Sequence, residues 1–494
     1  MGYTDIVFIK PAAAPGLYGG LSRFGLPAIE PPLHAALLAA LLREQGYSTA
    51  VLDPEAEGWG MEETARRAFE LEPRLLAVIV AGANPSASTM CMAGARLLLG
   101  ALRKCDPMVP IVLGGLHPTV LPQRTLEEED ADFVCLGEGF LTLPRLVAAI
   151  KAGDTGYAIP GLWHKCGGHI VPNPPAPLLD DLNALPMPAW DLLPMARYRA
   201  HNWHCFGPIE RRSPYAVIYT TLGCPYHCHF CCTNALFGKA GIRYRAPKNV
   251  AKEIDYLVRV HGVRNLKIMD EMFVLNRRHV ETLCGLLIER GYDLNIWAYA
   301  RVNTVNEALL DVMRRAGIRW LVYGFESGSQ EVLESVSKGY RIESVDTTVQ
   351  MTRDAGIHIL GNYLFGLPGD DAASMQATLD MAFRINAEWA NFYTVMALPG
   401  SALYEEALAK GWTLPETWAS YSQYAYDCQP LPTEHLTPAQ VLAFRDQAFH
   451  TYYSNPRYLD MIRDTFGDEA VAHISDMASH TLRRKLTEKP CEER

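Results

Sequence analysis

The stretch Gly223-Cys-Pro-Tyr-His-Cys-His-Phe-Cys231 brings three cysteines together within eight residues, in a C-x-x-x-C-x-x-C spacing. It follows an apolar, strand-like run at residues 215–221. A loop this short turns the thiols of Cys224, Cys228 and Cys231 toward one point, which suits a metal or an iron–sulfur cluster, and no disulfide pairing explains three such thiols. A four-iron cluster held by three cysteines keeps one iron free to bind another molecule.

A closed zinc site is the alternative, because zinc takes four Cys or His ligands and His227 or Cys232 is available as the fourth. Two observations weigh against zinc. Cys232 adjoins Cys231, and neighbouring side chains in a loop seldom reach one metal ion together. No second C-x-x-C pair follows at the distance found in zinc ribbons.

The composition is that of an ordinary globular protein. The 494 residues predict two or three domains, and the chain is 49% hydrophobic and 20% charged. A formal net charge of -10 argues against a nucleic-acid or anionic-membrane partner. The amino terminus does not resemble a signal peptide, and every apolar run is too short to be a transmembrane segment. The cysteines outside the loop are scattered, which predicts a reducing, cytoplasmic location.

Residues 1–150 alternate short apolar runs with helical stretches. Five buried strands joined by helical crossovers predict an α/β fold with a doubly wound, Rossmann-like parallel sheet. In such a sheet the ligand lies beyond the carboxyl ends of the strands. The predicted strands are residues 6–9, 49–52, 75–80, 111–113 and 133–136.

The loops that follow the third, fourth and fifth of these strands are small and rich in glycine or hydroxyl groups. Each one alone is explained by a turn or a helix N-cap. Together, at one edge of a sheet, they predict backbone brought close to a large flat or phosphate-bearing ligand. The residues concerned are Asn84, Ser86 and Ser88 in the first loop, Gly114, Gly115, His117, Pro118 and Thr119 in the second, and Gly137, Glu138 and Gly139 in the third.

A Pro- and Gly-rich stretch at 151–210 predicts a linker. Within residues 211–400, six strand–helix units predict a partial (β/α)6 barrel of the TIM type, with its working face at the carboxyl ends of the strands. The cysteine loop follows the first of these strands and so belongs to that face. Residues 401–494 predict a C-terminal helical region, in which the tyrosines at 421–426 either pack or cover the barrel mouth.

Charged and small residues follow the next three barrel strands. Asp270 and Glu271 follow the second strand and Arg301 the third, and Glu326, Ser327 and Gly328 follow the fourth. A carboxylate at such a place is also explained as a solvated strand end or a helix N-terminal charge.

The cysteine spacing, with Phe230 just before the last cysteine, resembles the signature of radical S-adenosylmethionine (SAM) enzymes. Gly114-Gly-Leu-His-Pro-Thr119 and Asp132-Phe-Val-Cys-Leu-Gly-Glu-Gly139 resemble the cobalamin-binding domain that precedes many of their barrels. The architecture is similar to that of anaerobic magnesium-protoporphyrin monomethyl ester cyclase and cobalamin-dependent radical SAM methyltransferases. One departure concerns the loop at 10–16, which lacks the Asp-x-His-x-x-Gly motif that supplies a histidine to cobalt.

The resemblance implies a domain of residues 1–150 that binds cobalamin, a linker at 151–210, and a radical SAM barrel at 211–400. It implies a 4Fe–4S cluster on Cys224, Cys228 and Cys231, and cobalamin at the three glycine- and hydroxyl-containing loops. We predict a turn or supporting role for His117, and we place Asn84 near the lower cobalt face. The resemblance assigns SAM to Phe230, Asp270, Glu271, Arg301, Glu326, Ser327 and Gly328, and it identifies no catalytic residue.

The reaction that this resemblance implies is C-methylation of an unactivated carbon through a 5′-deoxyadenosyl radical and methylcobalamin. Oxidative cyclisation or rearrangement of a tetrapyrrole-like or other substrate is one alternative. A radical SAM enzyme with a non-catalytic first domain is the other. The resemblance further implies a small-molecule substrate and an electron donor such as flavodoxin or ferredoxin, but no motif identifies the substrate.

Overall fold

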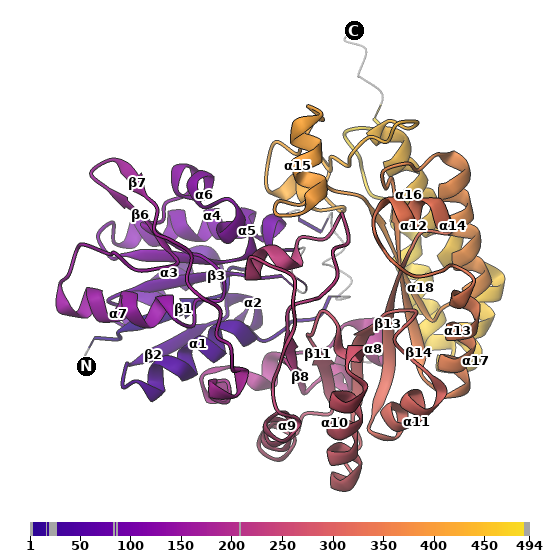
Figure 1. Ribbon diagram of the computed structural model, residues 1–494, viewed down its shortest axis with the longest axis horizontal. Helices are drawn as coiled ribbons and strands as arrows, with labels where there is room; N and C mark the ends of the chain where they lie inside the picture. Colours follow the sequence, from indigo (N-terminus) through magenta and orange to yellow (C-terminus); the bar gives the residue numbers. More distant parts are fainter. Residues whose placement is uncertain are drawn as a thin grey trace.

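The computed structural model describes residues 3–15, 17–18, 27–82, 84, 87–206 and 209–488. Two α/β halves lie beside each other, and the helix α15 (Ala402–Ala409) lies above the space between them (Figure 1). In the described ranges, no helix is long and apolar enough to cross a membrane.

The first half contains a seven-stranded sheet in the order β2-β1-β3-β4-β5-β6-β7. The first five strands in this order are parallel, as predicted. The order 2-1-3-4-5 reverses direction between β1 and β3, and such a switch point opens a crevice at the carboxyl ends of the strands. The strands are β1 (Ile6–Ile9), β2 (Thr49–Leu52), β3 (Leu76–Val80), β4 (Ile111–Gly115), β5 (Phe133–Cys135), β6 (Leu162–Cys166) and β7 (His169–Val171).

Helices cover both faces of this sheet, because its strands are apolar on both sides. Ile6 and Phe8 of β1 share a core with α1 and α7, whereas Val7 and Ile9 share the opposite core with α3 and α4. The helices of this half are α1 (Leu33–Glu44), α2 (Pro54–Glu57), α3 (Met61–Glu70), α4 (Ser88–Cys105), α5 (Leu116–Val120), α6 (Pro122–Glu128) and α7 (Thr142–Ala152).

The hairpin β6–β7 lies inside the stretch that the sequence predicts to be a linker. Gly167 and Gly168, between the two strands, have φ values of +57° and +81°. Two consecutive positive φ values form the hairpin turn that matches the twist of antiparallel strands. The hairpin pairs with β5 in antiparallel orientation and extends the parallel sheet by two strands. The Gly167-Gly168 pair between two short β-prone runs, residues 162–164 and 170–171, is the sequence signal for this hairpin inside the predicted linker.

The second half is a partial barrel of six parallel strands in the order β15-β14-β13-β12-β11-β8, which confirms the predicted fold. Its strands are β8 (Tyr215–Ile218), β11 (Asn265–Ile268), β12 (Asn295–Ala300), β13 (Ile318–Glu326), β14 (His358–Phe365) and β15 (Trp389–Thr394). Its outer helices are α9 (Pro247–His261), α10 (Arg277–Arg290), α11 (Glu307–Arg315), α12 (Gln330–Ser335), α13 (Ser344–Asp354) and α14 (Ala372–Ile385).

The amino end of the barrel is filled with aromatic rings. Trp203, from α8 (Asn202–Cys205), packs edge-on against Trp297 and Trp320 at centroid distances of 5.3 and 5.2 Å. The carboxyl end differs, because alternate strand residues that point inward keep partial solvent exposure. The barrel interior is therefore packed at its base and open toward its mouth. The partly exposed inward residues are Tyr219, Met269, Glu271, Tyr299, Asn362, Asn391 and Tyr393.

The C-terminal helices α16 (Pro438–Tyr453), α17 (Pro456–Phe466) and α18 (Asp468–Ser479) cover the open edge of the barrel. Tyr453 donates its hydroxyl hydrogen to Ala390 O (2.7 Å) on β15, and Tyr452 does the same to Ala387 O (2.7 Å). An unpaired strand edge invites pairing with another chain, and these phenols occupy it instead.

Candidate functional site

The cysteine loop begins directly after β9 (Thr221–Leu222), which pairs with β10 (Arg243–Tyr244) in a small antiparallel ladder. Gly223 has a φ of +94°, and a Cβ at this position would lie 2.5 Å from Gly241 O. Only glycine allows this close approach, so the chain can turn from β9 into the loop. The loop therefore lies at the carboxyl end of β8, where the sequence predicts it.

His229 holds the cysteine loop against two helices. Its backbone N–H donates to Val336 O (3.0 Å) at the end of α12, and its carbonyl accepts from Leu403 N (3.0 Å) on α15. Its ring nitrogen Nε2 lies 2.7 Å from Glu406 Oε2, also on α15. Since the loop contains no helix or strand of its own between Cys224 and Cys231, these three contacts fix its path.

Cys224, Cys228 and Cys231 are each partly exposed, and their thiols interact with one another. Burial raises the pKa of Cys224 to about 11, and the neighbouring Cys231 and Cys228 act in the same direction. Burial also raises the pKa of Cys231. Cysteines of a four-iron cluster bind different irons, and within the described residues no three His, Cys, Asp or Glu side chains are grouped closely enough to hold one metal ion.

Arg301, at the carboxyl end of β12, is buried beside the cysteine loop. Its guanidinium lies 3.8 Å from the centroid of the Tyr226 ring, a cation–π contact with a residue of the loop itself. Its Nε and Nη2 atoms are buried and have no hydrogen-bond partner. A buried guanidinium edge without an acceptor is unfavourable on its own, and it fits a carboxylate that binds from solution.

Glu326 and Lys338 form a buried ion pair next to Arg301. The distance between Lys338 Nζ and Glu326 Oε1 is 2.6 Å. Lys338 also interacts electrostatically with Cys228 and Arg301. Burial would lower the pKa of Lys338, but the Glu326 carboxylate and then the Cys228 thiol more than offset this, so the pKa is raised. Four charged or titratable groups therefore lie close together at the cysteine loop: Glu326, Lys338, Arg301 and Cys228.

The two carboxylates that follow β11 have different surroundings. Asp270 is fully buried and accepts hydrogen bonds from Thr220 N (2.6 Å) and from the Thr220 hydroxyl, which joins the ends of β8 and β11. Glu271 is partly exposed, and its Oε2 accepts from Gly223 N (3.3 Å) at the start of the cysteine loop. Burial raises the pKa of Asp270 to about 6 and that of Glu271 to about 7. Of the two, Glu271 is accessible to a ligand.

Ser327 and Gly328 pack against α14. The Ser327 side chain is buried beside the Thr378 hydroxyl, and Gly328 N donates to that same hydroxyl at 2.8 Å. A Cβ on Gly328 would lie 2.3 Å from Ala377 O, so this glycine permits close contact between strand and helix. Phe230 is partly exposed and lies 5.9 Å below Lys338 Nζ.

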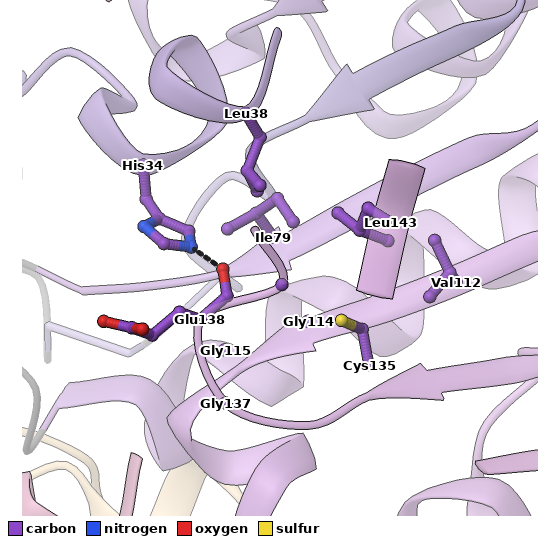
Figure 2. A pocket seen from close by; sticks show the side chains of 11 residues that line it. His34, Leu38, Ile79, Val112, Gly114, Gly115, Cys135, Gly137, Glu138 and Leu143 are labelled. Atoms are coloured by element: carbon purple, nitrogen blue, oxygen red, sulfur yellow. Dashed lines mark hydrogen bonds between the residues drawn. The ribbon is translucent and has the colours of Figure 1, made fainter. Parts of the chain in front are cut away.

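In the first half, the predicted glycines line a narrow hollow between α1, α7 and the sheet (Figure 2). A Cβ on Gly115, whose φ is +125°, would lie 2.3 Å from Val80 O, so this glycine allows β3 and β4 to end close together. His34 closes one side of the hollow, with its Nε2 atom 2.9 Å from Glu138 O. The residues that line the hollow are His34, Leu38, Ile79, Val112, Gly114, Gly115, Cys135, Gly137, Glu138, Gly139 and Leu143.

The Glu138 side chain points away from this hollow and joins the two halves of the molecule. Its carboxylate pairs with the Arg243 guanidinium of β10, with one contact of 3.0 Å from Nη1 to Oε2. Arg243 also donates to Leu179 O (2.7 Å) in the connecting segment. The loop after β5 is therefore fastened to the hairpin that carries the cysteine loop.

The remaining predicted residues of the first half make mostly local contacts. The Ser88 hydroxyl donates to Val80 O and accepts from His117 N, the Thr119 hydroxyl donates to Gly115 O, and Asn84 Oδ1 accepts from Ala87 N. The His117 ring packs 4.5 Å edge-on against Trp418, and burial lowers its pKa to about 3. The His117 ring is thus enclosed by Thr89 of α4 and by Trp418. Pro118 follows His117 in α5 and is buried, and Ser86 lies outside the described residues.

The tyrosines at 421–426 divide between the two predicted roles. Tyr421 is buried and packs with Trp418 against the first half, and Tyr426 is exposed. Tyr424 is partly exposed, and its ring centroid lies 6.1 Å from that of Tyr18 in the first half. It also interacts electrostatically with Tyr393 of the barrel. Tyr424 thus lies between the halves, above the open end of the barrel.

Four residues of this region were not predicted from the sequence: His34, Tyr226, Arg243 and Lys338. Tyr226 lies within the cysteine loop that the sequence singles out, and His34 lies in the first turn of α1. Arg243 lies on a two-residue strand and Lys338 just after α12, so neither follows a barrel strand directly. No periodicity in the sequence indicates that they reach the site.

Two family models match the chain. The B12 binding domain matches residues 26–147, and the Radical SAM superfamily matches residues 218–382. An uncharacterised methyltransferase of Pyrococcus horikoshii is 29% identical over 88% of this chain and 90% of that protein. An anaerobic magnesium-protoporphyrin IX monomethyl ester cyclase of Rubrivivax gelatinosus is 27% identical over 76% of this chain and 66% of that protein.

The structure of the radical SAM methyltransferase TsrM from Kitasatospora setae, with cobalamin and a 4Fe–4S cluster bound, has the same fold. The TM-score is 0.69, the identity is 19%, and the match covers 96% of this chain and 99% of that one.

Replacement of a cluster cysteine tests which thiols bind iron. We expect Cys228→Ala to abolish the iron content and visible absorbance of anaerobically reconstituted protein, because the cluster loses one of three ligands. Cys232→Ala is the matched control, since this buried neighbour should not be a ligand. A Cys232→Ala protein without iron, or stoichiometric zinc in the unmodified chain, would contradict the assignment.

Proposed function

Because the chain is a radical SAM enzyme that carries an N-terminal B12-binding domain, we propose that it C-methylates an unactivated carbon of a small-molecule substrate. The observation that carries this proposal is the ion pair between Glu138 and Arg243. It joins the loop that lines the glycine hollow to the hairpin that carries the cysteine loop. The carboxyl ends of the two sheets are therefore held together, as a reaction that uses both cofactors requires.

The barrel mouth fits SAM. The unpaired Nε and Nη2 atoms of Arg301 match the carboxylate of its methionine part, and Glu271 is the accessible carboxylate for its ammonium group. Glu326, held by Lys338, is the further candidate for the ribose or the amine. Asp270, Ser327 and Gly328 support these residues indirectly, since their polar groups are bonded to Thr220 or Thr378.

The first half has a small hollow beside the loops that we assign to cobalamin. Gly114, Gly115, Gly137 and Gly139 line this hollow, and its other walls are mainly apolar. His117 is buried against Trp418, so we assign the loop after β4 to positioning and not to cobalt ligation. Asn84 makes a local cap to Ala87 N and stays partly exposed, which keeps it as our candidate near the lower cobalt face.

The bound cofactors supply the chemistry: SAM and the cluster provide the 5′-deoxyadenosyl radical, and methylcobalamin provides the methyl group. The residues of the chain orient and enclose the substrate. Tyr219, Tyr299 and Tyr393 are neutral phenols, since burial raises the pKa of each, and they offer hydrogen-bond donors on the inner wall. Tyr424 contacts Tyr18 of the first half and lies near Tyr393 of this wall, so it is our candidate to cover the substrate.

Oxidative cyclisation is the second candidate, and the similarity to the Rubrivivax gelatinosus cyclase favours it. In either reaction an external one-electron donor such as flavodoxin or ferredoxin is needed.

We propose a reducing, cytoplasmic compartment for the protein, because the cysteines of the described residues are free thiols.

The Arg301→Met variant tests the role of this guanidinium in SAM binding separately from its effect on thermal stability. We expect SAM binding to weaken by about 1.5–3 kcal/mol, or roughly 10- to 150-fold in Kd, because a charged hydrogen bond is lost. The thermal midpoint without SAM should stay equal or rise, since a buried charge without an acceptor is removed. The measurements are titration calorimetry and thermal unfolding. Arg319→Met is the control, because Arg319 lies at the amino end of β13, away from the barrel mouth. Unchanged SAM affinity in Arg301→Met would exclude a role of Arg301 in binding the SAM carboxylate.

Product analysis separates methyl transfer from cyclisation. Protein purified without oxygen should contain cobalamin, and after addition of SAM and a low-potential reductant both 5′-deoxyadenosine and S-adenosylhomocysteine should form. S-adenosylhomocysteine reports a transferred methyl group. Deoxyadenosine as the sole SAM-derived product in cobalamin-loaded protein would refute methylation. Protein that binds no cobalamin would support a first domain without a catalytic role.

A further inference from the structure

In the proposed function, the only role of Lys338 is to hold Glu326. Several features of the local backbone nevertheless position this lysine. Its side chain is 11% exposed and its ammonium group bonds to Glu326 Oε1 at 2.6 Å. A buried ion pair is usually close to neutral for stability, because the loss of hydration offsets the attraction. The position of the pair therefore calls for a different explanation.

Both partners depend on unusual backbone. Glu326 has a φ of +57°, and Ser337, directly before Lys338, has a φ of +54°. Non-glycine residues rarely adopt this left-handed conformation, and such residues are concentrated at functional sites. The register between β13 and β14 also shifts between Gly324 and Glu326, a β-bulge that redirects the Glu326 side chain.

Two glycines provide the space that the charged groups occupy. A Cβ on Gly324 would lie 2.3 Å from Glu326 Oε1 and 2.8 Å from Lys338 Nζ. A Cβ on Gly339 would lie 3.2 Å from Arg301 Nη2. Two strained residues and Gly324 thus converge on one ion pair, and Gly339 makes room for the neighbouring Arg301, so the location of the pair is specified by the backbone.

The groups that surround the Lys338 ammonium belong to the cysteine loop and the SAM site. They are the Glu326 carboxylate, the Cys228 and Cys231 thiols, the Arg301 guanidinium and, at 5.9 Å, the face of the Phe230 ring. Glu326 is the nearest negative charge and offsets most of the lysine charge. The two cysteines are where negative charge increases when a cluster bound there accepts an electron.

We propose that Lys338 is a positioning residue that sets the reduction potential of the iron–sulfur cluster and that Glu326 limits its effect. A positive charge in a poorly hydrated site favours the more negative, reduced state, and a negative charge opposes it. This inference rests on the assignment of the cluster to Cys224, Cys228 and Cys231, but it does not depend on methyl transfer.

The test is an EPR-monitored redox titration of reconstituted protein without SAM. Lys338→Met should shift the midpoint potential of the cluster to more negative values, because the positive charge is lost. Glu326→Gln should shift it in the opposite direction, because Lys338 is no longer offset. Lys338→Arg keeps the charge and should stay close to the unmodified chain. Lys239→Met, an exposed lysine beyond the cysteine loop, should leave the potential unchanged.

Iron content and thermal midpoint are measured on each variant before the titration. If Lys338→Met does not assemble a cluster, Glu326→Gln alone still gives the sign of the effect. Unchanged potentials, or shifts of Lys338→Met and Glu326→Gln in the same direction, would overturn the proposal. Loss of iron from the unmodified chain would instead overturn the cluster assignment on which it rests.

Discussion

The ion pair between Glu138 and Arg243 joins the loop after β5, at the carboxyl end of the first sheet, to β10, which flanks the cysteine loop at the barrel mouth. Both carboxylate and guanidinium are mostly buried, so each depends on the other for its charge to be compensated. Glu138 follows β5 and Arg243 stands on β10, beside the cysteine loop. A parallel sheet gathers its functional loops at one edge. The pair brings two such edges together, and the location of the site between the halves follows from it.

The fold was predictable because its rules are local and repetitive. Alternation of apolar strands and helices, as in residues 6–9 followed by 33–44, gives the parallel sheets. The position of Cys224 after a barrel strand then places the loop at the mouth. The β6–β7 hairpin was missed because Pro and Gly dominate the surrounding stretch and masked a short strand pair.

The roles of single residues were less predictable, because they depend on burial and on contacts distant in sequence. Asp270 and Glu271 are adjacent in the chain, yet Asp270 is buried and bonded to Thr220 at the end of β8, whereas Glu271 accepts from Gly223 at the start of the cysteine loop. Glu138 was predicted among the cobalamin residues, and its backbone lines the hollow while its carboxylate pairs with Arg243. The pairing of Lys338 with Glu326 requires a bulge and two left-handed residues, which no sequence pattern displays.

We propose that one site between the halves holds both cofactors. Cob(II)alamin and a reduced 4Fe–4S cluster each carry unpaired electrons, so pulsed EPR of doubly loaded protein tests this claim directly. We expect a dipolar coupling between the two centres. Two independent, uncoupled spectra from protein that contains full cobalamin and full iron would contradict it.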